Sequence, residues 1–251
     1  EPEVFARTRR FLHQADFVVG RLTGIFDVSD YSNALKTGYD LVDECWPAWI
    51  GAFDGVLERL PRVVAPGRRI GRVSASASQE TDLPAGLPVV AGATDGTAAC
   101  LASGVRHPGD YNTTLGTTLV FKGVSDRIGK HPQGLVYSHK LPGGLWLPGG
   151  ASNTGAEWIE AWFGGEDPRE LDRAASGLLP CDAVAYPLAR KGERFPFRCD
   201  SASGFFAPGP ADRMTRYAAG LQGTALLERL SYEVLDEVTG HSGGGVYSTG
   251  G

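Results

Sequence analysis

Residues 88–97 read PVVAGATDGT, and this stretch decides the class of fold that the sequence predicts. Its first four residues form a short apolar strand that runs into Gly92. The small residues that follow, from Asp95 to Ala102, are compatible with a helix. We therefore expect a strand, a sharp turn carrying Asp95 and a helix, which together make one unit of an α/β protein.

The segments before this stretch also predict short regular elements. Apolar residues spaced by threes and fours predict a helix from about Phe5 to Leu22, and Gly24 is expected to stop it. Residues 60–73 mix prolines, glycines and β-branched side chains, so they predict an extended connection with short strands. The first part of the chain is thus expected to be rich in helices.

The composition changes at residues 108–109, where the sequence reads Pro-Gly. Residues 111–121 are typical of a β-hairpin that turns at Gly116. Later, an apolar helical face over residues 227–238 predicts a long helix that ends before Gly240. We expect two domains, residues 1–108 and 109–251, with Asp95 and the Gly116 turn beside a small-molecule cleft at their junction.

Composition and charge exclude several classes of protein. The chain has 251 residues, of which 42% are hydrophobic and 21% charged, so it should fold as a globular protein. A net charge of -5 disfavours a general nucleic-acid or anionic-membrane surface. The sequence holds no long apolar run and no signal peptide, which predicts a soluble, cytoplasmic protein. The cysteines lie far apart and are expected to be free thiols, at Cys45, Cys100, Cys181 and Cys199.

Asp95 is the first candidate for chemistry. A carboxylate at the start of a helix can simply cap free backbone amides, which is a structural role. The functional alternative is a general base, since Gly92 and Gly96 would let a substrate approach closely. Thr94 and Thr97 could then offer hydroxyl groups for hydrogen bonds.

Two further segments have both a structural and a functional interpretation. Residues 113–118 read TTLGTT, so they could bind phosphate through exposed backbone amides, or form an ordinary hairpin. Glu193 and Arg194 lie in a charged turn and could simply pair at the surface. The histidines share no ligand spacing, and the motifs of zinc proteases, serine hydrolases and P-loop enzymes are absent, so no metal-ligating residue is assigned.

Taken together and in order, these pieces resemble the FGGY carbohydrate kinases, the family that includes xylulokinase and ribulokinase. The resemblance covers nearly the whole chain. It rests on RLTG at 21–24, DYSNA at 30–34, PVVAGATD at 88–95, LGTT at 115–118, GERFP at 192–196, and the glycines Gly250 and Gly251, which resemble the start of a triple-glycine adenosine motif.

The resemblance implies an α/β fold of the actin-like ATPase (ribonuclease H-like) type, with two domains around a cleft. Residues 1–108 would be the C-terminal part of the sugar-binding domain, and residues 109–251 the N-terminal part of the nucleotide-binding domain. The chain would then be a central fragment of a longer protein. An earlier phosphate motif with a metal-associated aspartate would precede it, so the isolated fragment is not expected to phosphorylate a sugar efficiently.

The resemblance also assigns roles to residues. Asp95 would be the general base, accepting the proton of a sugar hydroxyl as its oxygen attacks the γ-phosphoryl group of ATP. Phosphate oxygens would be held by Gly116, Thr117 and Thr118, and Gly250 and Gly251 would belong to the ATP site. Asp95 and Gly96 would contact the sugar.

The implied partners are small molecules, namely a sugar and ATP with Mg²⁺, and a homodimer is an assembly that the resemblance allows. A ketopentose such as ribulose or xylulose is the first expectation. Several relatives carry Asn or Ala at the position of Gly96, which leaves the sugar open. The alternatives are a kinase for another polyol or a sugar acid, and a non-catalytic relative that only binds sugar or nucleotide.

Overall fold

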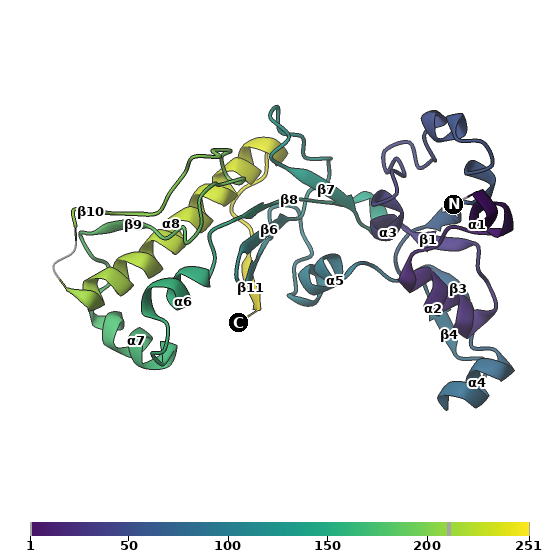
Figure 1. Ribbon diagram of the computed structural model, residues 1–251, viewed down its shortest axis with the longest axis horizontal. Coiled ribbons are helices and arrows are strands. Elements are labelled where there is room, and N and C mark those ends of the chain that lie inside the picture. Colours follow the sequence, from purple (N-terminus) through teal and green to yellow (C-terminus); the bar gives the residue numbers. More distant parts are fainter. Residues whose placement is uncertain (1, 210–211, 251) are drawn as a thin grey trace. The chain divides into compact units, whose positions relative to one another are not determined.

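The computed structural model describes residues 2–209 and 212–250, and the chain divides into two compact units (Figure 1). Unit 1 contains residues 1–98 and 139–145, and unit 2 contains residues 99–138 and 146–251. The chain therefore passes from unit 1 to unit 2 inside one helix, α5 (Asp95–Ala102), and later returns to unit 1 for a short segment. The functional domains expected on either side of residues 108–109 stay a prediction.

Unit 1 is built on two small sheets. Strand β1 (Val28–Asp30) pairs in parallel with β2 (Arg62–Val64), and β3 (Arg69–Arg72) pairs in antiparallel fashion with β4 (Pro88–Val90). The extended connection and short strands predicted over residues 60–73 are confirmed. The helical elements of unit 1 before α5 are α1 (Pro2–Arg7), α2 (Gln14–Thr23), α3 (Tyr31–Leu35), η1 (Ala48–Ala52), η2 (Leu57–Arg59) and α4 (Ala75–Thr81), and η3 (Pro142–Gly144) lies in the returning segment.

The single helix expected over residues 5–22 is wrong, because two helices, α1 and α2, occupy this region. Between them the backbone N–H of Phe11 donates to the carbonyl of Arg59, a bond outside any helical ladder. The Asp16 carboxylate then accepts the backbone N–H of His13 at 3.0 Å, which caps a new helix start. The predicted stop is confirmed, since Gly24 has φ +78° at the C-terminal end of α2.

The strand and helix predicted around Asp95 are confirmed as β4 and α5. Strand β4 is less buried than its apolar sequence suggests, since Val90 is 49% exposed. The helix that follows packs better, with Cys100 almost completely buried. The Asp95 turn thus joins a half-exposed strand to a helix with one buried face.

Unit 2 contains a five-stranded sheet with the strand order β11-β5-β6-β8-β7. Strands β5 (Tyr111–Leu115) and β6 (Leu119–Gly123) form the predicted hairpin, with Leu115 opposite Leu119. Strand β11 (Val246–Gly250) lies parallel to β5, so both strands end at the same edge. The remaining strands of the sheet are β7 (Tyr137–Lys140) and β8 (Trp146–Ser152).

The long helix α8 (Arg213–Thr239) organises the core of unit 2. The helix predicted before Gly240 is confirmed, and Gly240 has φ +71° at its C-terminal end. Its second half buries Leu227 and Leu235 against Phe121 of the sheet. Its first half packs against α6 (Glu157–Phe163) and α7 (Pro168–Ala175), and it also contacts the small β9 (Val184–Tyr186) and β10 (Phe205–Ala207) sheet.

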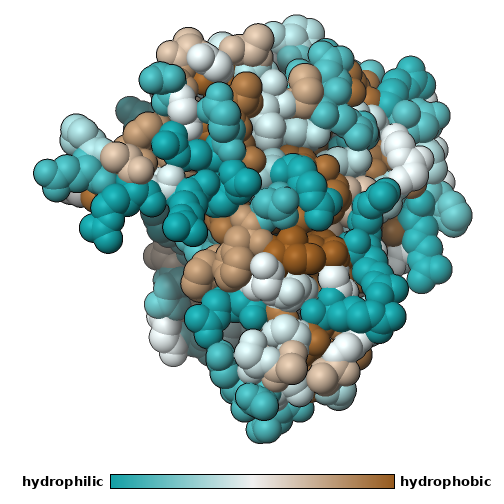
Figure 2. All heavy atoms as spheres, turned by 90° about the vertical axis from the view of Figure 1, so that its right-hand side faces the viewer, coloured by the Kyte–Doolittle hydropathy of each residue, from teal (hydrophilic) through white to brown (hydrophobic). Residues whose placement is uncertain are grey.

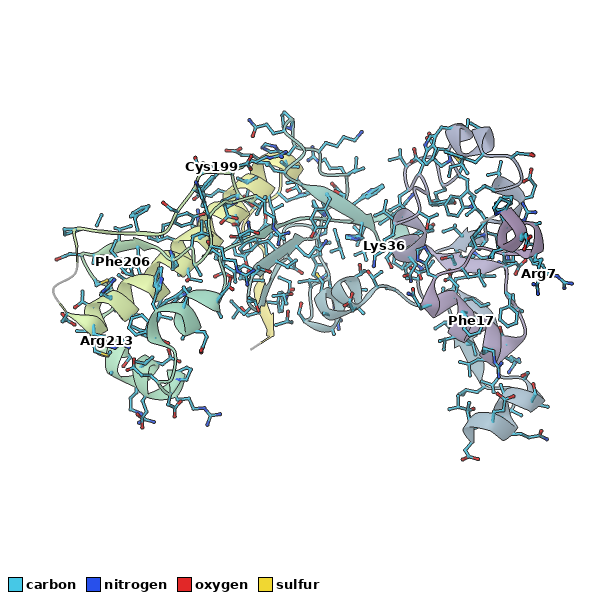
Figure 3. The ribbon with its side chains drawn as sticks, viewed as in Figure 1. Arg7, Phe17, Lys36, Cys199, Phe206 and Arg213 are labelled. Carbon is cyan, nitrogen blue, oxygen red and sulfur yellow. The ribbon has the colours of Figure 1, made fainter. Side chains whose placement is uncertain are left out.

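Aromatic and charged side chains hold the start of α8 in place. Arg213 pairs with Glu166 and its guanidinium carbon lies 4.7 Å from the Phe163 ring centroid (Figure 3). Phe206 packs on Trp162, with ring centroids 5.0 Å apart. The Arg213 contacts connect α8 to α6 and the residues after it, and the Phe206–Trp162 contact connects β10 to α6.

The surface carries both hydrophilic and apolar regions. Figure 2 shows one face on which apolar side chains form a patch bordered by hydrophilic ones. In unit 1, Phe17, Val18 and Trp49 are each more than half exposed, which is typical of surfaces that pack against further protein. None of the helices within the described ranges is long and apolar enough to cross a membrane. All four cysteines are free thiols, as predicted.

Gly223 provides a test of the packing between α8 and β9. A Cβ atom at this position would lie 2.0 Å from the carbonyl oxygen of Ala185. We expect Gly223→Ala to lower the free energy of unfolding by about 1–3 kcal/mol, because this clash outweighs the better helix propensity of alanine. Urea unfolding measures the loss.

Gly177→Ala is the matched control, since a Cβ at Gly177 meets no heavy atom within 4 Å. Equal stability of the two variants would contradict the close contact between α8 and β9.

Candidate active site

Asp95 is the first residue of α5, and its side chain is exposed. The carbonyl of Thr94 accepts the backbone N–H groups of Thr97 and Ala98, at 3.0 and 2.9 Å. The Asp95 Oδ1 accepts the backbone N–H of Gly96 at 2.8 Å, while Oδ2 has no hydrogen bond among the described residues. The capping alternative therefore accounts for one carboxylate oxygen, and the other is available to a ligand.

The two glycines beside Asp95 border open space. A Cβ atom at Gly92 or Gly96 would meet no heavy atom within 4 Å. Neither glycine is needed for a tight packing contact, so the space above the turn is open to a small molecule. This arrangement agrees with the approach route expected from the sequence.

A buried carboxylate fixes the chain next to this turn. Asp30, at the end of β1, is only 3% exposed and precedes α3. Its Oδ1 accepts hydrogen bonds from the backbone N–H and the hydroxyl of Ser32, at 2.8 and 2.6 Å, and from the backbone N–H of Asn33. Its Oδ2 accepts the Asn33 side-chain amide at 2.6 Å. The DYSNA motif is thus a closed hydrogen-bonded unit.

Ser32 connects this unit to the Asp95 turn. Its Oγ accepts the backbone N–H of Thr94 at 2.8 Å, across 62 positions of sequence. The hydroxyl therefore donates to Asp30 and accepts from the residue before Asp95. The sequence places Ser32 in the DYSNA motif, two positions after a capping aspartate, and gives no other signal for this role.

Ser32 offers a test of this positioning contact. We expect Ser32→Ala to lower kcat by about tenfold to a hundredfold, because the Thr94 amide loses its acceptor and the Asp95 turn loses its anchor. Steady-state kinetics of the complete protein measure the effect, with the KM for nucleotide expected to stay unchanged.

Ser76→Ala, on the exposed side of α4, is the control and should behave as the natural protein. A normal kcat in Ser32→Ala would show that the contact does not position Asp95.

The candidate phosphate-binding segment of unit 2 is the turn between β5 and β6. Thr117 is exposed, and Gly116 and Thr118 are half-buried. Backbone hydrogen bonds hold the turn to residues 154–156. The Ala156 N–H donates to the Gly116 carbonyl at 2.8 Å, and the Leu119 N–H donates to the Thr154 carbonyl. The hydroxyl groups and amides of the turn are thus presented by a fixed backbone.

Gly250 lies beside this turn. It pairs with Leu115 in the parallel β11–β5 ladder, and its φ is +93°. A Cβ atom at Gly250 would lie 2.1 Å from the Leu115 carbonyl oxygen, so only glycine allows this approach. Unit 2 therefore brings Gly250 and residues 116–118 to one edge of the sheet. Gly251 lies outside the described residues.

A glycine run, residues 243–245, forms a loop before β11. Asp110 holds this loop, accepting the Gly245 N–H at 3.0 Å and the N–H groups of Arg106 and His107 at 2.9 Å. Burial acts to raise the pKa of Asp110, but these backbone donors outweigh it and lower the pKa below its usual value. The loop is thus anchored to the start of β5.

Glu193 is a buried acceptor, and the interpretation of a surface pair with Arg194 is wrong. Glu193 is 2% exposed. Its Oε2 accepts the hydroxyl groups of Ser152, Thr154 and Tyr186, at 2.8, 3.1 and 2.7 Å. Its Oε1 accepts the backbone N–H groups of Asn153 and Arg194, at 2.7 and 2.9 Å.

These bonds compensate the buried charge of Glu193 and fix residues 152–154. Burial, together with the bond to Glu193, raises the pKa of Tyr186, so its hydroxyl stays a donor at neutral pH. Since Thr154 in turn accepts from Leu119 at the end of the turn, the Glu193 carboxylate supports the phosphate candidate. Local sequence gave no signal for this support, because Ser152, Asn153 and Thr154 lie about 40 positions before Glu193.

Gly155 gives a test of the turn. A Cβ at Gly155 would lie 2.3 Å from the Thr117 carbonyl oxygen and 2.5 Å from the Thr118 Cα. We expect Gly155→Ala to displace the turn and raise the KM for ATP by about tenfold or more, while the KM for sugar changes little.

Gly177→Ala is again the control, since its Cβ would lie in open space. An unchanged KM for ATP in Gly155→Ala would separate this turn from nucleotide binding.

No group of three or more histidine, cysteine, aspartate or glutamate side chains that could hold a metal ion is found among residues 2–209 and 212–250. Asp95 and Gly96 lie in unit 1, and residues 116–118 and Gly250 lie in unit 2.

Solved structures share this fold. The chain is 27% identical to a xyloylose (xylulose) kinase from Brucella ovis, with a TM-score of 0.85, over 100% of this chain and 53% of that one. It is 27% identical to a xylulose kinase from Rhodospirillum rubrum, with a TM-score of 0.82, over 96% of this chain and 51% of that one. The fold is therefore that of the actin-like sugar kinases, as expected.

Sequence comparison places the chain more narrowly. Residues 1–102 match the N-terminal domain of the FGGY family of carbohydrate kinases. The L-xylulose/3-keto-L-gulonate kinase of Escherichia coli is 28% identical over 71% of this chain and 37% of its own length. The xylulose kinase of Streptomyces rubiginosus is 33% identical over 59% of this chain and 30% of its own length. The chain is thus similar to the FGGY carbohydrate kinases, through this N-terminal domain and through the curated relatives.

The chain spans about a third of the length of these two curated relatives and about half of the two solved structures.

Proposed function

We propose that the protein transfers the γ-phosphoryl group of ATP to a hydroxyl group of a sugar, with Asp95 as the general base. The observation that carries this proposal is the state of Asp95: an exposed carboxylate, with one oxygen unbonded, in a turn anchored by the Ser32 hydroxyl. A general base needs a free lone pair in a fixed position, and this turn supplies both.

In the proposed reaction, the Asp95 carboxylate accepts the proton of the sugar hydroxyl as that oxygen attacks phosphorus. The amides and hydroxyl groups of Gly116, Thr117 and Thr118 hold phosphate oxygens, and Gly250 and Gly251 belong to the ATP site. Mg²⁺ bound with ATP would supply positive charge that offsets the charge of the phosphate groups. Phosphoryl transfer depends on positioning and charge stabilisation, which suits a fixed carboxylate and a fixed turn of backbone donors.

The proposed substrate is a ketopentose such as xylulose or ribulose. Asp95 and Gly96 are the residues that we propose contact it. Support comes from the relatives, several of which are named as xylulose kinases or ribulokinase. One relative's name also includes 3-keto-L-gulonate, a sugar acid, so sugar acids are the second class to test. A protein that lies in the cytoplasm and forms a homodimer would suit this role.

The decisive experiment measures ADP release by the complete protein with Mg-ATP and a panel of ketopentoses, polyols and sugar acids. We expect turnover with one sugar and a loss of about 10²–10⁴ in kcat in Asp95→Asn, with ATP binding kept.

Asp54→Asn replaces another exposed carboxylate of unit 1 and should keep full activity. Normal turnover in Asp95→Asn would end the assignment of the base. ATP binding without turnover on any sugar would favour a binding-only relative.

A further inference from the structure

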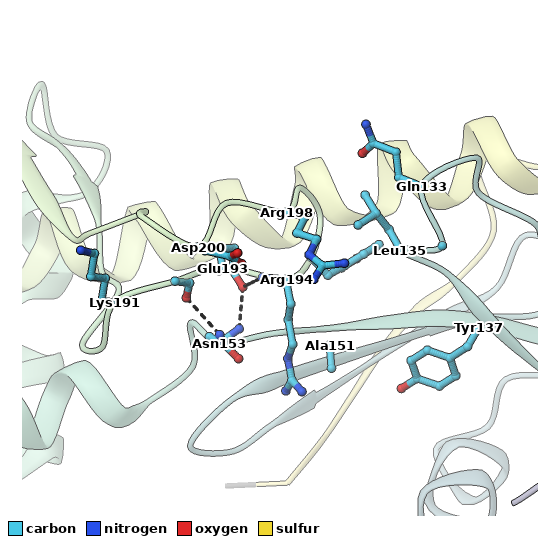
Figure 4. Close-up of a pocket in the computed structure, with 13 residues that line it drawn as sticks. Gln133, Leu135, Tyr137, Ala151, Asn153, Lys191, Glu193, Arg194, Arg198 and Asp200 are labelled. Atoms are coloured by element: carbon cyan, nitrogen blue, oxygen red, sulfur yellow. Dashed lines mark hydrogen bonds between the residues drawn. The ribbon is translucent and has the colours of Figure 1, made fainter.

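A cavity of about 560 Å³ lies in unit 2 (Figure 4). None of residues 116–118 lines it, and Asp95 belongs to unit 1. Its walls come from the segment with residues 133–135, from strands β7 and β8, and from residues 191–200. Its volume is in the range of sites for small molecules.

Three cationic side chains line this cavity: Lys191, Arg194 and Arg198. None of the three side chains has an ion pair or hydrogen bond with any residue that the structure describes. Arg190, in the same segment, instead pairs with Glu157, so the segment does not leave all of its arginines unpaired. An arrangement of unpaired cations around a cavity is suited to an anion.

The acidic residues of the wall do not cancel this charge. The Glu193 carboxylate already accepts five hydrogen bonds from neighbouring segments. Asp200 is the other acidic residue of the wall and is exposed. One cation can be balanced by Asp200, which leaves the others for a ligand that carries more than one negative charge.

The rest of the lining suits the body of a small polar molecule. Leu135 and the buried Phe195 provide apolar surface, and Gln133 provides an amide. Burial raises the pKa of the Tyr137 phenol, although the charge of Arg194 acts in the opposite direction, so the hydroxyl stays protonated. In Figure 4, Arg198 lies beside Leu135, and Arg194 extends between Asn153 and Ala151.

We propose that this cavity binds a phosphorylated small molecule of sugar size, whose phosphate group is held by Arg194 and Arg198. A phosphate dianion has the charge and the several acceptor oxygens that separate guanidinium groups require. A carboxylate carries one negative charge and two acceptor oxygens. A neutral sugar carries no charge. Binding at this site needs no phosphoryl transfer, so the proposal does not depend on the proposed function.

The test is a calorimetric titration of the complete protein, in the presence of saturating Mg-ADP, with ribose 5-phosphate, with inorganic phosphate and with neutral ribose. We expect ribose 5-phosphate to bind, and Arg194→Gln and Arg198→Gln each to weaken its Kd by about tenfold or more. Both side chains are exposed, so these variants should fold normally. Arg169→Gln, an exposed arginine outside the cavity, is the control and should bind as the natural protein.

The same titration in Asp95→Asn separates this site from the candidate active site, because binding should persist there. Equal affinity in the natural protein and in both cavity variants would overturn the proposal, as would an absence of binding. If inorganic phosphate bound as tightly as ribose 5-phosphate, the proposal that the cavity also contacts the sugar part of the ligand would be overturned. Binding of neutral ribose with equal affinity would overturn the role of the phosphate group.

Discussion

The candidate base depends on a carboxylate that does no chemistry itself. Asp30 lies away from water, where an ionised group is costly unless hydrogen bonds surround it. Its partners are supplied within three residues, by Ser32 and Asn33. The Ser32 hydroxyl donates its proton to Asp30, so its oxygen is free to accept the backbone N–H of the distant Thr94. The backbone before Asp95 is therefore held by a motif that lies far away in sequence.

Unit 2 fixes its candidate phosphate-binding turn, residues 116–118, in a different way: glycines beside the turn have no side chain. Gly155 and Gly250 let the backbone approach the turn more closely than any Cβ atom would permit. Glu193 adds a charged acceptor that holds the segment behind the turn. Donors that are fixed before a ligand arrives need little reorganisation when charge develops, which is the condition for electrostatic stabilisation.

The local sequence predicted the elements that depend on interactions between residues close together in the chain. The hairpin at residues 111–121, the long helix before Gly240 and the Asp95 turn follow from periodicity and glycine placement, and all three are confirmed. The break between α1 and α2 could not be predicted, because Phe11 bonds to Arg59, far away in sequence. The burial of Glu193 could not be predicted either, because most of its hydrogen-bond donors lie far away in sequence. The family resemblance located the candidate residues, and their supporting contacts came only from the structure.

The return of residues 139–145 to unit 1 has a consequence for the order in which the chain can fold. The polypeptide connects the two units at residues 98–99, 138–139 and 145–146. Within unit 1, the returning segment is fastened by Lys140, whose Nζ donates to the Leu41 carbonyl at 2.9 Å and pairs with Glu44. Unit 1 therefore cannot form all of its contacts while residues 139–145 are missing from the growing chain, so a fragment that ends before residue 139 would lack the Lys140 contacts.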